Sequence, residues 1–570
     1  MECSLTKRYV RLCPDALVAV WLGVWWLVNL VQAGCSELAN DEAYYHMFAE
    51  HLAWGYFDHP PVTALLVWLG ERLFGGELGV RFFFTLLQPL YLWVLWRLIR
   101  PKDATRRDAA LYVVIAAATL MLQLYGFLAV PDGPLLFSAA LFLWTFRRFA
   151  DRRPWSWLWM GLAMALMAYS KYHGALVVLF VLAANPRQLL RPTLYLSGAV
   201  ALVLLVPHLL WQYHHDWASF AYHLSGRNAV FRVSYVTDFL VNMLVVFNPF
   251  FVPLYIQAWR RTRPQTPVGR ALKLLPVAFI VFFLLSALRG YVQPQWVIVA
   301  SFGLVYVLFD YARRHPRTRR YVMRAGTVTL VLVLAVRAEM LFNPLGLRFE
   351  VFDNAAHYGA IAEVADGRPV VFRGGYAVAA KYGFYTGGEA YCQPNINYRT
   401  HQWQFRDDDT RFIGREVLIE CPASAADSTL DVRSVTLPTG KRFSWFVDRS
   451  FHPVRQVDIA FTGLSGRTAP GEELHLVLHI KNSYPYEIRV GEGDTRLALL
   501  WKHGRFRVDA FPLDDRFTLP AGGELTREVT FRVAPQLAGE RFDVGFALQR
   551  TGYANWFNGK SLPTEVSLHP

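Results

Sequence analysis

Long apolar segments alternate with short polar ones along the first 341 residues, and this alternation then stops. A helix needs about 20 apolar residues to cross a bilayer, so the pattern predicts a polytopic α-helical membrane domain over residues 1–341. Three predicted spans, at 134–149, 155–170 and 174–184, are short for a crossing. The full set, about eleven spans, is 15–33, 79–99, 108–129, 134–149, 155–170, 174–184, 193–212, 235–258, 272–288, 296–311 and 321–341.

The first apolar segment, Ala16 to Ala33, also has features of a signal peptide. It follows basic residues, and Ala33-Gly34-Cys35 is similar to a lipoprotein cleavage site. However, Gln32 stands where such a site has an aliphatic residue, and the apolar run exceeds the usual length of about 7–15 residues. We therefore interpret this segment as the first transmembrane helix.

After residue 341 the pattern becomes typical of a soluble protein. In residues 342–452, HYGAIAEVADG has a helical pattern and PVVF a strand pattern, which predicts a small α/β region. In residues 453–570, apolar and polar positions alternate in segments separated by Gly, Pro and Asn turns, which predicts a β-sandwich. These predicted strands are VDIAFTG, LHLVLHIKN, LTREVTFRV and FDVGFALQR.

The formal net charge of +14 reflects 58 Lys and Arg against 44 Asp and Glu. Such an excess is compatible with a nucleic-acid partner, but the cations lie in short clusters between apolar segments rather than on one face. Because Lys and Arg favour cytoplasmic loops, we interpret the charge as a topology signal and expect no nucleic-acid partner. The clusters lie within 97–107, 147–153, 187–191, 260–263 and 313–320, after every second predicted span.

This spacing places all the basic clusters on one side, together with the basic N-terminus. The opposite, outer loops are 34–78, 130–133, 171–173, 213–234 and 289–295. With an odd number of spans, the chain from residue 342 onward joins them on the outer side.

The five cysteines give no sign of a metal centre. They contain no C-x-x-C pair and have no histidine at zinc-finger spacing, so no structural metal site is expected. A disulfide between Cys392 and Cys421 would be permitted outside the cytoplasm. The cysteines are Cys3, Cys13, Cys35, Cys392 and Cys421.

The first outer loop is rich in acids, histidines and aromatic residues from Asn40 to Val62. Asp41 and Glu42 are adjacent, and neighbours on a helix do not share a face, so we expect only one of them to point into a given cavity. An isolated pair of this kind is also explained by helix capping. The Tyr and Trp residues of the loop fit an interfacial belt as well as a sugar-binding platform.

Five segments, taken in order, resemble glycosyltransferase family 39, which includes protein O-mannosyltransferases and the bacterial aminoarabinose transferase acting on lipid A. Each segment is a weak signal alone, and their order makes the resemblance specific. It implies a GT-C fold and a lipid-linked sugar donor. The segments are D-E-A-Y-Y with G-Y-F-D-H-P-P in the first outer loop, V-P-D-G-P-L-L-F (130–137), Y-S-K-Y-H-G (169–174), W-A-S-F-A-Y-H-L-S-G-R (217–227) and R-G-Y-V-Q-P-Q-W (289–296).

The resemblance also implies particular site residues. The catalytic acid of the family falls on Asp41, with Glu42 beside it, and the second acidic position falls on Asp132. The lipid A branch commonly has a Lys before its Pro-Pro pair, where this chain has His59 preceded by Asp58. This departure weakens any claim that the sugar is aminoarabinose or that the acceptor is lipid A.

We therefore expect an inverting transfer of a sugar from a polyprenyl-phosphate carrier to lipid A, another surface glycan or a protein. The expected location is a bacterial inner membrane, with the soluble domain in the periplasm. An attacking hydroxyl must lose a proton, so a carboxylate, Asp41, is the expected general base. The leaving phosphate needs cations, and no metal or other cofactor is required. Candidate phosphate ligands are Arg227, Arg289, Lys171 and His59, and candidate substrate contacts are Tyr44, Tyr45, Asp58 and His173.

Each candidate also has a structural explanation. Arg227 and Arg289 are suited to contacts with lipid headgroups, Lys171 and His173 to a buried ion pair, and Asp132 to a turn. For the whole chain, the alternative is a polytopic transporter or flippase of lipid-linked sugars. The spans show no two-half symmetry and the acids gather in one outer loop, which favours the enzyme.

Overall fold

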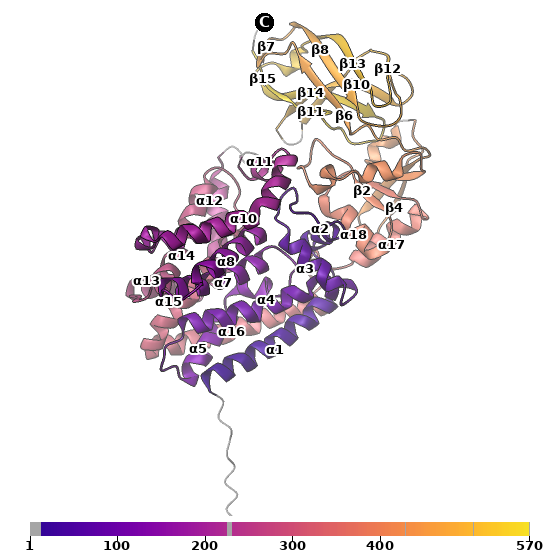
Figure 1. Cartoon of the computed structure of the whole chain (residues 1–570). Helices are drawn as coiled ribbons and strands as arrows, with labels where there is room; N and C mark the ends of the chain where they lie inside the picture. Colours follow the sequence, from indigo (N-terminus) through magenta and orange to yellow (C-terminus); the bar gives the residue numbers. More distant parts are fainter. Residues whose placement is uncertain (1–12, 225–230, 428, 505–506, 569–570) are drawn as a thin grey trace, which may run out of the picture. The chain divides into compact units, whose positions relative to one another are not determined.

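The computed structural model describes residues 13–224, 231–427, 429–504 and 507–568. The chain forms two compact units, residues 1–352 and 353–570, which Figure 1 draws in indigo to pink and in salmon to yellow. The last long helix of the first unit ends at Phe342, next to the predicted division after residue 341.

The N-terminal unit is built from helices, and each predicted span contains at least one. Within the described residues, five helices are long and apolar enough to cross a membrane by themselves. They are α1 (Pro14–Cys35), α4 (Gly76–Ile99), α10 (Pro192–His214), α14 (Pro267–Ala287) and α16 (Pro316–Phe342). Shorter helices complete the bundle: α7 (Asp132–Ala150), α8 (Ser156–Ser170), α9 (Gly174–Ala183) and α15 (Ala300–Arg314).

Two predicted spans are broken helices. Span 108–129 consists of α5 (Arg106–Ala117) and α6 (Leu120–Leu124), and span 235–258 of α12 (Val233–Val246) and α13 (Val252–Arg261). In the second break, Asn248 has a left-handed φ of 69° and precedes a proline, so the helix cannot continue. The Asn248 side chain donates to the Ala118 carbonyl at 3.0 Å, in the first break. Backbone groups that a helix break leaves unpaired within a membrane need other partners. The Asn248 side chain, at the second break, is such a partner for the Ala118 carbonyl at the first.

Three further helices lie outside the predicted spans. They are α2 (Asn40–Ala49), α3 (Val62–Glu71) and α11 (Ala218–Leu224). The α3 helix is apolar but only 10 residues long, so it falls short of a crossing.

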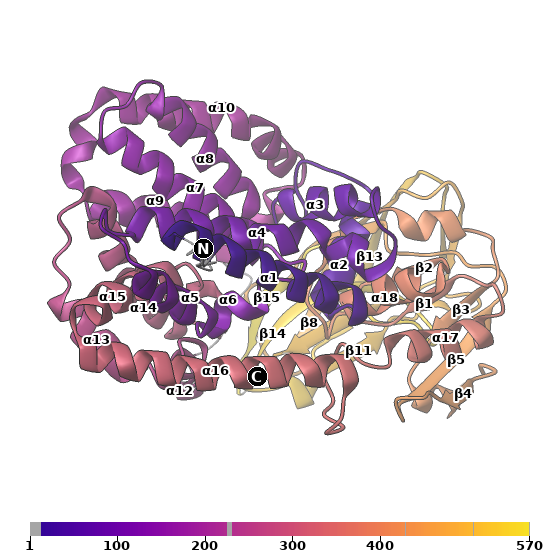
Figure 2. The same ribbon diagram turned by 90° about the horizontal axis from the view of Figure 1, so that it is seen from below.

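Four of the five basic clusters, all but 187–191, meet at one end of the bundle, as the charge pattern predicted. They line a shared cavity of about 900 Å³. At the opposite end, the Asn40 side chain donates to Glu350 at 2.6 Å, so the chain that leaves α16 lies beside α2. Figure 2 shows α16 as one long helix along the edge of this unit. The arginines and lysine of the shared cavity are Arg97, Arg100, Lys102, Arg147, Arg148, Arg153, Arg263 and Arg314.

The C-terminal unit begins with an α/β region. Its five-stranded sheet has the order β2-β1-β3-β5-β4, in which β1, β2 and β3 are parallel. The predicted helix and strand are confirmed as α17 (Asn354–Ala365) and β1 (Val370–Phe372). The other elements are α18 (Tyr376–Thr386), β2 (Ala390–Cys392), β3 (Val417–Glu420), β4 (Arg433–Thr436) and β5 (Arg442–Asp448).

Cys392 and Cys421 are free, so the disulfide that the sequence permits is not formed. Cys392 is the last residue of β2 and Cys421 follows β3, and β1 lies between these strands. Two strand spacings of about 4.8 Å separate the thiols by roughly 10 Å, whereas a disulfide needs Cα atoms within about 7 Å. Burial raises the pKa of the Cys392 thiol, which keeps it protonated and unreactive.

The rest of the unit is the predicted β-sandwich. One sheet contains β13, β8 and β6, and the other contains β11, β10, β14, β15 and β7, with β9 and β12 as a separate pair. All four predicted strands are present, as β6 (Val457–Thr462), β8 (Glu473–Asn482), β13 (Glu524–Arg532) and β14 (Arg541–Arg550). The remaining strands are β7 (Arg467–Thr468), β9 (Ile488–Val490), β10 (Thr495–His503), β11 (Arg507–Pro512), β12 (Phe517–Leu519) and β15 (Leu562–Val566).

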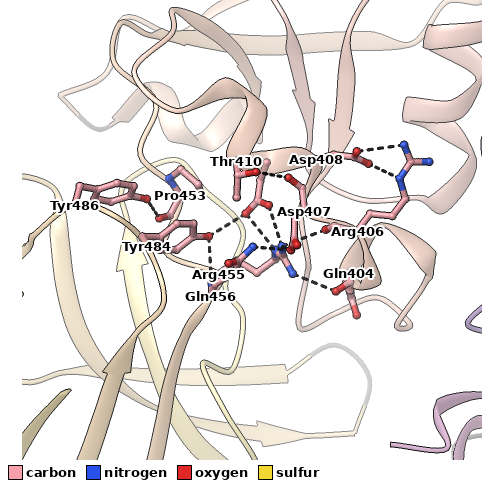
Figure 3. Close-up of polar contacts among 11 residues, drawn as sticks. Gln404, Arg406, Asp407, Asp408, Thr410, Pro453, Arg455, Gln456, Tyr484 and Tyr486 are labelled. Carbon is pink, nitrogen blue, oxygen red and sulfur yellow. Dashed lines mark hydrogen bonds and ion pairs between the residues drawn. The ribbon is translucent and has the colours of Figure 1, made fainter. Parts of the chain in front are cut away.

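A buried polar cluster joins the α/β region to the sandwich (Figure 3). Arg455 donates to the Asp409 carboxylate at 2.9 and 3.1 Å, and the Tyr484 hydroxyl donates to the same group at 2.9 Å. Asp409 is fully buried. Because a buried charge is tolerated only when it is paired and hydrogen-bonded, this cluster makes the two regions pack as one unit.

Candidate active site at one end of the bundle

Glu42 forms a fully buried ion pair with Arg81 of α4. The guanidinium donates from Nε at 2.7 Å and from Nη2 at 2.6 Å to the two oxygens of the carboxylate. Arg81 also donates to the carbonyls of Ala33 and Ser36 at the end of α1. This side-by-side geometry is the strongest form of charge-assisted hydrogen bond, and it fixes α2 against α1 and α4.

The same carboxylate positions the loop that leads to Asp132. The Ala129 N–H donates to Glu42 Oε1 at 2.8 Å, so α2 lies against residues 125–131. Tyr125, in this loop, has electrostatic interactions with both Asp132 and Asp41. Tyr125 therefore lies near both acids that the family resemblance singled out, although these are about 90 residues apart in sequence.

Asp41 differs from its neighbour in exposure. It is half-buried, whereas Glu42 is completely buried. Adjacent residues on a helix point about 100° apart, so the two side chains differ in direction as well as in exposure. That only one of them points into a substrate cavity stays a prediction.

Asp132 and Lys171 form a second buried ion pair. Lys171 Nζ lies 2.7 Å from Asp132 Oδ1, and the two residues are 5% and 3% exposed. Asp132 begins α7, and Lys171 directly follows α8. The pair brings outer loops 130–133 and 171–173 into contact, in line with the ion pair considered for Lys171.

The segment from Trp54 to His59 is held against α10 and α11. The Trp54 carbonyl lies 2.7 Å from His208 Nδ1, and the Asp58 carbonyl lies 3.0 Å from His223 Nε2. Gly55 is needed at this contact, because a Cβ there would lie 2.5 Å from the Trp211 ring. The His59 ring packs edge-on against Tyr45 at 5.4 Å.

Tyr172, which was not predicted as a site residue, contacts side chains of both α10 and α11. Its hydroxyl lies 3.2 Å from His208 Nε2 and accepts a hydrogen bond from Gln212 at 3.1 Å. Its ring packs against His223 at 5.4 Å. His208 and Gln212 are buried polar residues in a predicted span, as is Arg81 in another. Polar residues within spans are the sequence signal that would have found them.

His173 connects the remaining outer loop. Its ring packs against Phe283 at 5.4 Å and Trp296 at 5.3 Å, which joins loops 171–173 and 289–295. Arg289 is exposed just beyond the end of α14, and Arg227 lies outside the described residues.

Tyr44 and Tyr45 are buried, with 1% and 4% of their surfaces exposed. Their rings lie 4.6 and 5.6 Å from Phe48. They pack α2 in this structure, and a role in binding substrate stays a prediction.

The comparisons with known proteins concern the fold of the chain. Residues 58–211 match the family model described as dolichyl-phosphate-mannose-protein mannosyltransferase. The crystal structure of ArnT from Cupriavidus metallidurans bound to undecaprenyl phosphate is similar, with a TM-score of 0.57 and 17% identity over 75% of this chain and 97% of that chain. Its apo structure gives a TM-score of 0.56 and 14% identity over the same shares.

The N-terminal unit has the GT-C fold. The predicted resemblance to the mannosyltransferase family is confirmed, and the matched residues include Asp58, His59, Asp132, Lys171 and His173. An uncharacterised protein of Aquifex aeolicus (strain VF5) is 23% identical over 299 residues, which are 50% of this chain. The chain spans 58% of the length of that relative.

Proposed function

We propose that the protein transfers a sugar, with inversion, from a polyprenyl-phosphate carrier to an acceptor hydroxyl at the outer face of a bacterial inner membrane. The observation that carries this proposal is that Tyr125 lies near both half-buried Asp41 and Asp132, which pairs with buried Lys171, at one end of a GT-C bundle. The similarity to ArnT bound to undecaprenyl phosphate supports the choice of carrier.

In the proposed reaction, the acceptor oxygen attacks C1 of the sugar as the bond from C1 to the carrier phosphate breaks. Asp41 takes the proton of the acceptor hydroxyl, because it is half-buried, whereas the neighbouring Glu42 is fully buried. Glu42 is a positioning residue, since its oxygens already accept hydrogen bonds from Arg81, Ala39 and Ala129.

The carrier phosphate leaves with its negative charge and needs cations nearby. Lys171 supplies one positive charge, and its hydrogen bond to Asp132 fixes the position of the ammonium group. Arg289, Arg227 and His59 complete the proposed set, since all three belong to the outer segments that resemble the family.

A transfer assay in detergent tests the function. Purified protein is mixed with a radiolabelled polyprenyl-phosphate sugar and with lipid, glycan or protein fractions from the source membrane. We expect label to move into one fraction while free polyprenyl phosphate appears, because an enzyme needs no sealed compartment. Label that never leaves the carrier in detergent, together with uptake of the carrier sugar into sealed vesicles, would instead support a transporter.

The proposed topology places residues 353–570 in the periplasm. It is supported by the hydrogen bond from Asn40 to Glu350, which sets the end of α16 opposite the basic loops. Protease added to spheroplasts is therefore expected to remove the C-terminal unit, and a cytoplasmic marker protein serves as the control. Cleavage that occurs only after lysis would place this unit inside the cell.

A further inference from the structure

Arg337 lies on α16, the last helix of the N-terminal unit. Its side chain is buried, with 5% of the residue's surface exposed. Its Nη2 donates to Asn29 Oδ1 and to the Gln123 carbonyl, each at 2.9 Å. The guanidinium also lies 4.9 Å from the centre of the Phe127 ring. All of these contacts are with neutral groups.

The positive charge of Arg337 has no counterion among the described residues. No carboxylate forms an ion pair with it, and its Nη1 is buried without a hydrogen-bond acceptor in the described part of the chain. Arg81, the other buried arginine of this unit, has both a carboxylate and backbone carbonyls as partners. A buried charge without such partners costs several kcal/mol, so an anion at Nη1 would remove a large penalty.

Arg337 lines a cavity of about 390 Å³ with otherwise largely apolar walls. The cavity lies where the two broken helices meet, since Leu120, Asn248 and Pro249 contribute to its wall. Part of the cavity wall lies on the exposed apolar side of the helix bundle, which contacts lipid in a membrane protein. The exposed apolar residues there are Leu124, Val245, Leu332 and Val336. The site combines one buried cation with an apolar groove.

The position of Arg337 along α16 indicates the depth of the site. It lies five residues before the end of the helix at Phe342, or about 7.5 Å below the outer end. Arginine side chains near helix ends extend toward the membrane interface, where the phosphates of the outer leaflet lie.

This depth separates the site from Asp41. Arg337 binds Asn29, which donates to Gln88, and Gln88 lies seven residues from Arg81 on α4. That spacing is about 10 Å along the helix, whereas a general base must lie within about 3 Å of the proton that it takes. Arg337 is therefore linked to a level of α4 about 10 Å from Arg81, and we treat its site as separate from the one near Asp41.

We propose that Arg337 binds the phosphate of an anionic membrane phospholipid, with an acyl chain in the apolar groove. The ligand is a bilayer lipid rather than the sugar carrier, and the site goes beyond the proposed catalytic function. Binding relieves the unpaired charge at Nη1 and fills the space between the broken helices and α16.

Lipid titration of the purified full-length protein tests the proposal. Dioleoylphosphatidylglycerol is added to delipidated protein in detergent, and its affinity is measured by native mass spectrometry and by the rise in melting temperature. We expect Arg337→Gln to weaken this lipid at least about tenfold, since a hydrogen bond to a charged group contributes about 1.5–3 kcal/mol. Arg337→Lys keeps the charge and should retain part of the binding if the glutamine variant does not fold.

Arg324→Gln is the matched control, because this arginine is exposed on the same helix. It should bind phosphatidylglycerol as the wild type does. Equal affinity of wild type and Arg337→Gln would overturn the proposal, as would equal affinity for dioleoylphosphatidylcholine. Displacement of phosphatidylglycerol by an equimolar amount of undecaprenyl phosphate would identify the carrier as the occupant and also overturn it.

Discussion

Replacing Asp41 by asparagine is expected to lower the rate of sugar transfer by a factor of about 100 or more, the scale of general base catalysis. The amide has nearly the shape of the carboxylate but cannot accept the proton of the acceptor hydroxyl. Asp41 is half-buried, and the neighbouring Glu42 forms the buried pair with Arg81, so the fold should be retained. The measurement is turnover at saturating donor in detergent, with the melting temperature recorded for each variant.

Glu77→Gln is a suitable control for Asp41→Asn. Glu77 is a partly exposed acid in the first turn of α4, which starts at the outer end of the bundle. Its replacement should leave turnover within about twofold of wild type, since surface substitutions away from a site change little. Near-normal turnover in a folded Asp41→Asn protein would remove Asp41 from the mechanism.

The long helices of the membrane unit could be predicted from the sequence because a run of about 20 apolar residues determines a span locally. The breaks in spans 108–129 and 235–258 could not. The first break is held by Asn248, a residue 130 positions away that donates to the Ala118 carbonyl. The mean hydropathy of a short segment contains no information about a contact with so distant a residue.

Strand β10 was missed in the sandwich for a related reason. Its segment LALLW is continuously apolar rather than alternating, because both faces of the strand are buried. Leu497 and Leu499 belong to the sandwich core, whereas Ala498 and Leu500 pack with Ile396 of the α/β region. Alternation predicts a strand only where one face meets water.

In the site, helical geometry predicted that Asp41 and Glu42 would point in different directions. Which of the two side chains is buried could not be predicted. Glu42 is held by hydrogen bonds from Arg81, which is 39 residues away in sequence and lies inside a predicted span. The same applies to Lys171, whose partner Asp132 is recognised only once loops 130–133 and 171–173 meet.

Removing Arg81 is expected to have the largest effect on stability. Arg81→Met should destabilise the N-terminal unit by about 3–5 kcal/mol, because it leaves the Glu42 carboxylate buried without its counterion. The carbonyls of Ala33, Ser36 and Glu37 lose a donor at the same time. The measurement is the melting temperature of the detergent-purified protein. The control is Arg314→Ala, which breaks a half-exposed pair with Asp310 and should have a much smaller effect.

The double variant Arg81→Met with Glu42→Gln separates the ion pair from simple packing. Without a carboxylate to leave uncompensated, it should be more stable than Arg81→Met alone, since contacting residues have non-additive effects. It should still transfer sugar poorly, because the two hydrogen bonds from Arg81 that fix residue 42, and with it the helix that carries Asp41, are lost. A double variant that melts no higher than Arg81→Met would show that the unpaired charge is not the cause of the instability. Normal turnover in that variant would show that Asp41 keeps its position without the pair.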